Sequence, residues 1–206
     1  MQDKIIKIFY NDLYTQFTIN ELAKKTGISY SYVHKQIGDL KNRNIIIIEQ
    51  RSKRKYCRPN YKNPEIKTSF VKISNQIAED FLKKRDKIFF VVEKLLSVLP
   101  GKTDFNLLSI VLFGSLVKGT DFERSDMDLF IIVSSKEKYD ESIEMECVAL
   151  SKSFGIEINP LVAEPTNLLT MLKEKENNVG KEILLKNKII LFGAEKFWEL
   201  VFEAIK

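Results

Sequence analysis

The chain has 206 residues, of which 44% are hydrophobic and 30% are charged. This composition allows a packed core and excludes a chain that is disordered throughout. No apolar run reaches the roughly 18 residues of a membrane span, and the N-terminal residues lack the pattern of a secretory signal. Two cysteines exclude a disulfide framework and cannot form a zinc site by themselves. We therefore expect a cytoplasmic protein with reduced thiols.

The net charge of +5 is unevenly distributed along the chain. Residues 1–63 contain 13 Lys and Arg against 5 Asp and Glu, a net charge of +8. Residues 64–206 contain 20 against 23, a net charge of −3. The asymmetry indicates a basic module with a polyanionic partner, joined to a mildly acidic module.

Three short helices are predicted in the basic module. Residues 3–10 have the spacing of an amphipathic helix. A second helix begins at Thr18, because Thr-Ile-Asn-Glu is a capping box that pairs Thr18 with Glu21, and it ends at Gly27. Ser29 is the expected cap of a third helix that ends near residue 42.

A β-hairpin is predicted after the third helix. A β-branched run at 45–48 is followed by a charged turn at 50–55 and by Tyr56. Three helices followed by a hairpin form a helix-turn-helix with a wing. On this pattern, residues 1–60 resemble the winged-helix DNA-binding domains of bacterial and archaeal regulators.

The resemblance implies two sets of DNA-contacting residues. The N-terminal half of the third helix would enter the major groove and read base edges. The basic wing would contact phosphates, which set affinity rather than sequence choice. The base-reading candidates are Tyr30, Ser31, His34 and Lys35, and the phosphate-binding candidates are Arg51, Lys53, Arg54, Lys55 and Arg58. Two alternatives stay open: His34 is an ordinary surface residue, or the module binds protein, as some winged helices do.

A helical joint follows the wing. Apolar residues between about Ile73 and Leu99 have helical spacing, which predicts one long helix or two in series, stopped by Pro100-Gly101. We therefore predict an α+β protein with a winged helix-turn-helix at 1–63, connecting helix or helices at 64–99 and a third region at 100–206.

The third region contains the motif whose residues could bind a ligand or catalyse a reaction. An apolar run at 110–113 leads into Gly114-Ser115, and after ten residues Asp126 and Asp128 open a second apolar run at 129–133. Because strand side chains alternate, the two carboxylates point the same way, and oxygen ligands of this kind suit Mg²⁺ completed by substrate phosphates. Glycine allows close backbone approach to a phosphate. Together these pieces predict a nucleotide–metal site.

The segment LFGSLVKGTDFERSDMDLFIIV resembles the nucleotidyltransferase superfamily that includes DNA polymerase beta and kanamycin nucleotidyltransferase, and in particular the minimal nucleotidyltransferases. The family carries a third carboxylate on the next strand. Here the expected residue is Glu157, where the family more often has Asp, and Glu164 ranks second. A strand at 189–192 and a final helix at 195–205 complete the expected domain, with Trp198 in its core or at an interface.

The resemblance implies transfer of a nucleoside monophosphate from an NTP, with ATP expected, to an acceptor hydroxyl. Asp126, Asp128 and Glu157 would be the catalytic residues and would hold two Mg²⁺ ions. The expected nucleotide-binding residues are Gly114, Ser115, Lys118 and Ser125, with Ser125 more structural than chemical. Two alternatives are a DNA-binding transcriptional regulator with a nucleotide-sensing or vestigial domain, and an antitoxin-like protein nucleotidyltransferase. A homodimer is expected, because winged helices commonly bind paired half-sites.

Overall fold

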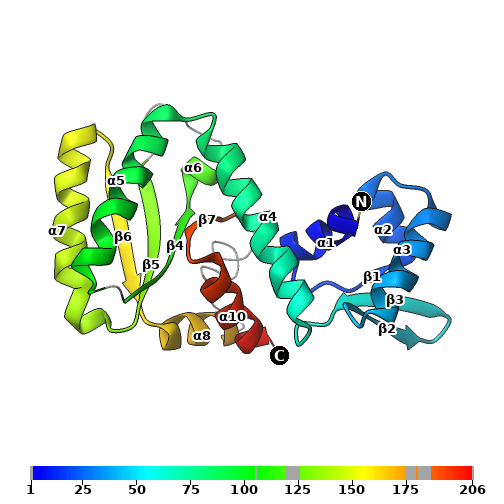
Figure 1. Ribbon diagram of the computed structural model, residues 1–206. Coiled ribbons are helices and arrows are strands. Elements are labelled where there is room, and N and C mark those ends of the chain that lie inside the picture. Colours follow the sequence, from blue (N-terminus) through cyan, green and yellow to red (C-terminus); the bar gives the residue numbers. More distant parts are fainter. Residues whose placement is uncertain (1, 105, 119–125, 175–179, 181–186, 206) are drawn as a thin grey trace. The chain divides into compact units, whose positions relative to one another are not determined.

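The computed structural model describes residues 2–104, 106–118, 126–174, 180 and 187–205. The chain divides into two compact units, Met1–Ile73 and Ser74–Ile205, so that the division falls inside one helix. Among the described residues, no helix is both long enough and apolar enough to cross a membrane. Figure 1 labels the helices and strands of both units.

The first unit combines helices with a small antiparallel sheet. Its elements are α1 (Gln2–Asn11), β1 (Phe17–Thr18), α2 (Ile19–Thr26), α3 (Tyr30–Asn42), β2 (Ile46–Arg51) and β3 (Arg54–Pro59). The strands lie in the order β1-β3-β2. The three helices and the hairpin agree with the prediction, whereas β1 was not predicted from the sequence. Because it has only two residues, β1 carries no alternation that a sequence pattern could reveal.

The helix ends of the first unit follow the local sequence closely. The Thr18 backbone amide donates to Glu21 Oε2 at 2.7 Å, and the Glu21 amide donates to Thr18 Oγ1 at 3.3 Å, which completes the predicted capping box. Gly27 ends α2 in the left-handed conformation with φ +67°. Ser29 occupies the cap position of α3 but forms no capping hydrogen bond through its side chain, so the predicted cap is positional only.

The predicted helical joint is two helices in series, α4 (Pro64–Leu82) and α5 (Asp86–Lys102). The α4 helix begins earlier than expected, because Asn63 Oδ1 accepts from the Glu65 amide at 2.8 Å and a proline is well tolerated in a first turn. The predicted stop at Pro100 is wrong. Pro100 lies inside the last turn of α5, which continues to Lys102, and Thr103 Oγ1 donates to the Leu99 carbonyl at 2.9 Å.

The second unit is built around a four-stranded mixed sheet in the order β6-β5-β4-β7. Strands β5 and β6 are parallel, and β4 is antiparallel to both β5 and β7. After α5 the elements are β4 (Leu107–Phe113), α6 (Ser115–Lys118), β5 (Met127–Val133), α7 (Lys136–Phe154), β6 (Ile158–Ala163), α8 (Pro165–Lys173), β7 (Ile189–Phe192) and α10 (Ala194–Ile205). Helices and sheets therefore combine in an α+β architecture, as predicted.

The two faces of this sheet have different roles. On one face, alternate residues of β5 such as Leu129 and Ile131 pack against buried residues of α5 and α7. The other face carries the intervening residues, which run along β5 from Asp128 through Phe130 to Ile132. Phe130 and Ile132 are buried. The apolar part of this face thus leads directly to a polar end, where β5 begins.

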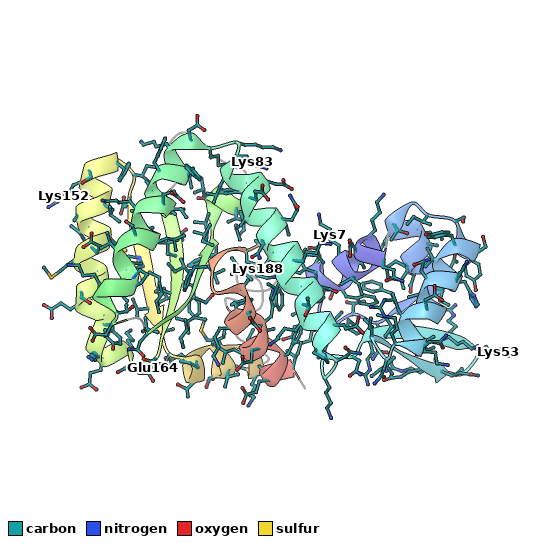
Figure 2. The ribbon with its side chains drawn as sticks, in the orientation of Figure 1. Lys7, Lys53, Lys83, Lys152, Glu164 and Lys188 are labelled. Atoms are coloured by element: carbon teal, nitrogen blue, oxygen red, sulfur yellow. The ribbon has the colours of Figure 1, made fainter. Side chains whose placement is uncertain are left out.

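The C-terminal helix contributes a buried aromatic cluster, and a buried lysine lies against it. Trp198 is fully buried, as predicted, and its Nε1 donates to Ser74 Oγ at 2.9 Å. Lys188 directly precedes β7, and its Nζ lies 5.0 Å from the centre of the Trp198 ring (Figure 2). Only 5% of Lys188 is exposed, and this burial lowers the pKa of its ammonium group to about 7.

Candidate functional site

Two carboxylates stand where β5 begins. Asp126 immediately precedes the strand, Asp128 is its second residue, and both are half-buried. Met127, which lies between them, is fully buried in the core formed with α5 and α7. Strand alternation therefore directs both carboxylates to the opposite face. The expected common orientation of Asp126 and Asp128 agrees with this arrangement.

The parallel register places polar residues of β6 beside the carboxylates. Met127 pairs with Ile158 and Asp128 pairs with Asn159, so Asp126 lies opposite Glu157. The Met127 amide donates to the Glu157 carbonyl at 2.8 Å. Glu157 is exposed and precedes β6 rather than lying within it. The backbone thus brings Glu157 next to Asp126, with its side chain toward solvent.

Asn159 is a site residue that the sequence did not suggest as a candidate. Its side chain donates a hydrogen bond to the Asp128 carboxylate. The pKa of Asp128 is nevertheless raised, first because the carboxyl is partly buried and second because the negative charge of Asp126 is close. The available signal was the two-residue period of the strand, which puts Asn159 on the same face as Glu157.

Gly114 fits against the Asp128 carboxylate. It follows β4, whose last residue Phe113 pairs with Asp128, and its φ of +81° is left-handed. A Cβ built at Gly114 would overlap Asp128 Oδ2 and would lie 3.1 Å from Asp128 Cγ. The sequence suggested a glycine for phosphate approach. The structure gives it a second reason, because only a residue without a Cβ leaves space for this carboxylate.

The other predicted nucleotide-binding residues follow Gly114 in α6. Ser115 begins this short helix and is half-buried, while Lys118 ends it and is exposed. The Lys118 amide donates to the Gly114 carbonyl at 3.3 Å. Ser125 lies outside the described residues. Gly114, Ser115 and Asp128 therefore lie at the same end of the paired strands β4 and β5.

The donor set suits a metal that takes further ligands from its substrate. In the part of the chain that the structure describes, no three His, Cys, Asp or Glu side chains form a group able to hold a metal ion. The predicted triad of Asp126, Asp128 and Glu157 is therefore not preassembled. Mg²⁺ is commonly bound through one or two carboxylates plus substrate phosphates. Burial, and after it the nearby charge of Asp126, raise the pKa of Asp128, and a bound cation would favour the ionised carboxylates.

Glu164, the second-ranked third carboxylate, has a structural role instead. It caps α8, where its side chain accepts from the Asn167 amide, and its own amide donates to Asn167 Oδ1 at 2.9 Å. It also accepts from the Lys136 amide at 2.9 Å. Glu164 follows β6, whereas Glu157 precedes it. The two acids therefore lie at opposite ends of one strand, and Glu164 is far along the sheet from Asp128.

A second candidate surface lies on the first unit. Tyr30, Ser31, His34 and Lys35 are all exposed on α3, as expected, while Val33, Ile37 and Leu40 are buried. The Tyr30 and His34 rings lie 5.9 Å apart. One solvent-facing side of α3 thus presents aromatic, hydroxyl and basic groups together.

The β2–β3 hairpin carries the predicted phosphate-binding residues, and Lys53 lies at its tip (Figure 2). Arg51, Lys53, Arg54 and Lys55 are exposed. Glu49 offsets part of this charge, because it pairs with Arg58 at 2.6 Å and with Arg51 at 3.1 Å. Lys53, Arg54 and Lys55 form no ion pair with any described residue, so they are the cations most available to a polyanion.

Comparison with known proteins supplies the family. Residues 93–196 match the family model described as polymerase beta, nucleotidyltransferase, and this range contains every residue of the candidate site on β4, β5 and β6. A curated protein of Methanocaldococcus jannaschii, named "Putative protein adenylyltransferase MJ1305", is 32% identical over 120 residues. That match covers 56% of this chain and 79% of the relative.

This chain belongs to the polymerase beta nucleotidyltransferase family. A solved structure of TrmBL2, an archaeal chromatin protein with a novel mode of DNA binding, gives a match of another kind. It covers 88% of this chain and 78% of TrmBL2, at 15% identity and a TM-score of 0.23. A similarity this low carries no argument about fold or partner, and the winged-helix assignment stays a prediction.

Proposed function

We propose that this protein is a Mg²⁺-dependent nucleotidyltransferase that moves a nucleoside monophosphate from an NTP, with ATP as the expected donor, to a hydroxyl group of a protein. The observation that carries the proposal is the fit of Gly114 against Asp128, beside Asp126, at one end of the sheet. The protein acceptor is supported by the name of the Methanocaldococcus jannaschii relative.

Each residue of the candidate site has a proposed role in this reaction. Asp126 and Asp128 hold the metal, and Asn159 orients the Asp128 carboxylate through its hydrogen bond. Bound Mg²⁺ supplies positive charge to the triphosphate and to the departing pyrophosphate. Gly114, Ser115 and Lys118 bind the triphosphate. Glu157 helps to hold the metal or accepts the hydroxyl proton.

One bond to the α-phosphorus forms and one breaks in this reaction. The acceptor oxygen bonds to the α-phosphorus, the bond from that phosphorus to the bridging oxygen breaks, and pyrophosphate leaves with the electron pair. Glu157 is suited to receive the proton because it is exposed and lies opposite Asp126 across the β5–β6 pair. Glu157 lies just before β6, and its side chain is longer than that of Asp, so its carboxylate can reach further toward the acceptor.

The test is transfer of label from NTPs that carry ³²P in the α-phosphate. The protein is incubated with each NTP, Mg²⁺ and cell extract, and the products are treated with protease or nuclease. We expect label from ATP in a protease-sensitive product, and none after addition of EDTA. Label in a nuclease-sensitive product would contradict a protein acceptor. Nucleotide binding without any labelled product would instead favour the nucleotide-sensor alternative.

We also propose that the first unit binds DNA as a winged helix. This second function is favoured by the exposed row on α3 and by the exposed cations of the wing, Lys53, Arg54 and Lys55, which form no ion pair with any described residue. In this arrangement α3 reads base edges and the wing contacts phosphates. Nucleotidyl transfer and DNA binding are separate claims, and either one can fail alone.

The salt dependence of DNA affinity tests the wing. Removing two phosphate contacts with Arg54→Ala plus Lys55→Ala is expected to make the slope of log K against log salt shallower by about 2. The matched control is Lys4→Ala plus Lys7→Ala, which removes the same charge from exposed positions on α1. Equal slopes for both double variants would contradict phosphate binding by the wing.

A further inference from the structure

A groove lies between the wing and the segment that joins α1 to β1. It has a volume of about 800 Å³ and is lined by Tyr14, Gln16, Arg51, Ser52, Lys53, Arg54 and Tyr56. We call this feature the wing groove. Its volume falls in the range of small-molecule sites, so it has space for a nucleotide. Every residue that lines it belongs to the first unit.

The wing groove combines aromatic rings with cations. Tyr14 is 52% exposed, and Tyr56 is half-buried with the Arg51 guanidinium 5.7 Å from its ring centre. Lys53 at the hairpin tip and Arg54 at the start of β3 line the same groove, and neither forms an ion pair with a described carboxylate. Aromatic rings beside unpaired cations are the combination that binds unpaired nucleotides, because bases stack on the rings and phosphates meet the cations.

Gln16 adds a hydrogen-bonding group at the same place. Among the described residues, Gln16 Oε1 is one of two buried side-chain atoms that have no hydrogen-bond partner. A buried polar atom without a partner costs free energy, so such atoms commonly mark strain or a missing ligand. Glutamine amides pair with base edges. A rotation of the Gln16 side chain toward the groove would satisfy this oxygen with a base.

We propose that the wing groove binds one unpaired nucleotide of a nucleic acid strand, with its base on Tyr14 and its phosphates on Lys53 and Arg54. The inference rests on the proposed DNA binding and adds a preference to it, for duplexes that end in an unpaired strand. A paired base is stacked inside a duplex and exposes only its edges. It therefore cannot place its face on Tyr14, whereas an overhanging base can.

The test compares two fluorescent probes by anisotropy, a blunt DNA duplex and the same duplex with a short single-stranded overhang. The wild-type protein is expected to bind the overhang probe about fivefold more tightly, which is the lower end of the effect of stacking one base. Tyr14→Ala should abolish this ratio, and Tyr14→Phe, which keeps the ring, should retain it. Because Tyr14 is half-exposed, thermal unfolding should show all three proteins folded.

Tyr30→Ala is the matched control, since Tyr30 is a similarly exposed tyrosine on α3. It should weaken binding of both probes and leave their ratio unchanged. Equal affinity of the wild type for the overhang and blunt probes, or an unchanged affinity ratio in Tyr14→Ala, would overturn the proposed role of the wing groove and leave the DNA-binding proposal standing. Full competition by free AMP would assign the groove to a mononucleotide and overturn strand binding. Binding of neither probe would overturn the DNA-binding function itself.

Discussion

Replacing Asp126 and Asp128 together with asparagine is expected to lower nucleotidyl transfer by a factor on the order of a thousand, because the pair supplies the charge that holds the metal. Asparagine keeps the size of each side chain and removes only its charge. The double variant should therefore retain the contact of residue 128 with Gly114. Initial rates of label transfer at saturating Mg²⁺ measure the effect.

The same variant should remain at least as stable as the wild type when metal is absent. Burial and the charge of Asp126 raise the pKa of Asp128, so its ionised form destabilises the folded protein. This cost is fully present above the folded-state pKa and disappears as the pH falls from that value toward the unfolded value. In EDTA at neutral pH, the Tm of the double variant should equal or exceed that of the wild type.

Asp140→Asn is the control for the loss of a surface carboxylate. Among the ion pairs of the described residues, Asp140 takes part only in one with Lys136 on α7, at 3.6 Å. It should transfer label at the wild-type rate. A double variant that keeps more than about a tenth of the wild-type rate would contradict the catalytic assignment, because a single lost electrostatic contact already costs about a hundredfold. A large fall in Tm would instead attribute the loss of activity to unfolding.

Replacing Gly114 with alanine is expected to damage both stability and catalysis. A left-handed backbone costs a residue with a Cβ roughly 1–2 kcal/mol, and the new methyl group would also displace the Asp128 carboxylate. A catalytic group displaced by about 1 Å can lower the rate by about a hundredfold. Thermal unfolding and label transfer measure the two effects separately.

A double-mutant cycle separates the overlap from the backbone strain. In an Asp128→Ala background the overlapping oxygen is gone, so Gly114→Ala should cost less stability than it does in the wild type. The difference should exceed about 0.5 kcal/mol, as expected for two residues in contact. Gly27→Ala is the matched control, since Gly27 is also left-handed, with φ +67°, and a Cβ there would meet nothing within 4 Å. Additive free energies of unfolding in the cycle would contradict direct packing of Gly114 against Asp128.

Local sequence predicted the parts of the fold that local physics determines. The capping box of Thr18 and Glu21, the left-handed Gly27 and the outward side of α3 all depend on residues within one or two helical turns of each other. The common orientation of Asp126 and Asp128 follows from strand alternation alone. The resemblance of the segment from Gly114 to Asp128 to the nucleotidyltransferase superfamily carried the wider prediction of a domain at 100–206, and the family model matches residues 93–196.

The remaining features depend on contacts between distant segments. The role of Asn159 requires the β5–β6 register, which no single strand specifies. From the sequence, Glu164 was a candidate metal ligand. Its role as the cap of α8, with a hydrogen bond from the Lys136 amide, depends on how α7 and β6 meet, and local sequence does not reveal that. The early start of α4 depended on the Asn63 side chain, and its sequence signal, Asn followed by Pro, also suits a turn.

The buried Lys188 has a consequence for how the second unit responds to acid. In the unfolded chain its ammonium group keeps the ordinary pKa of 10.5, whereas in the folded protein the pKa is about 7. Between these two pH values, folding expels a proton from the lysine into the solvent. Proton release and the closing of the core around Trp198 are thus one event, and a more acidic solution opposes both.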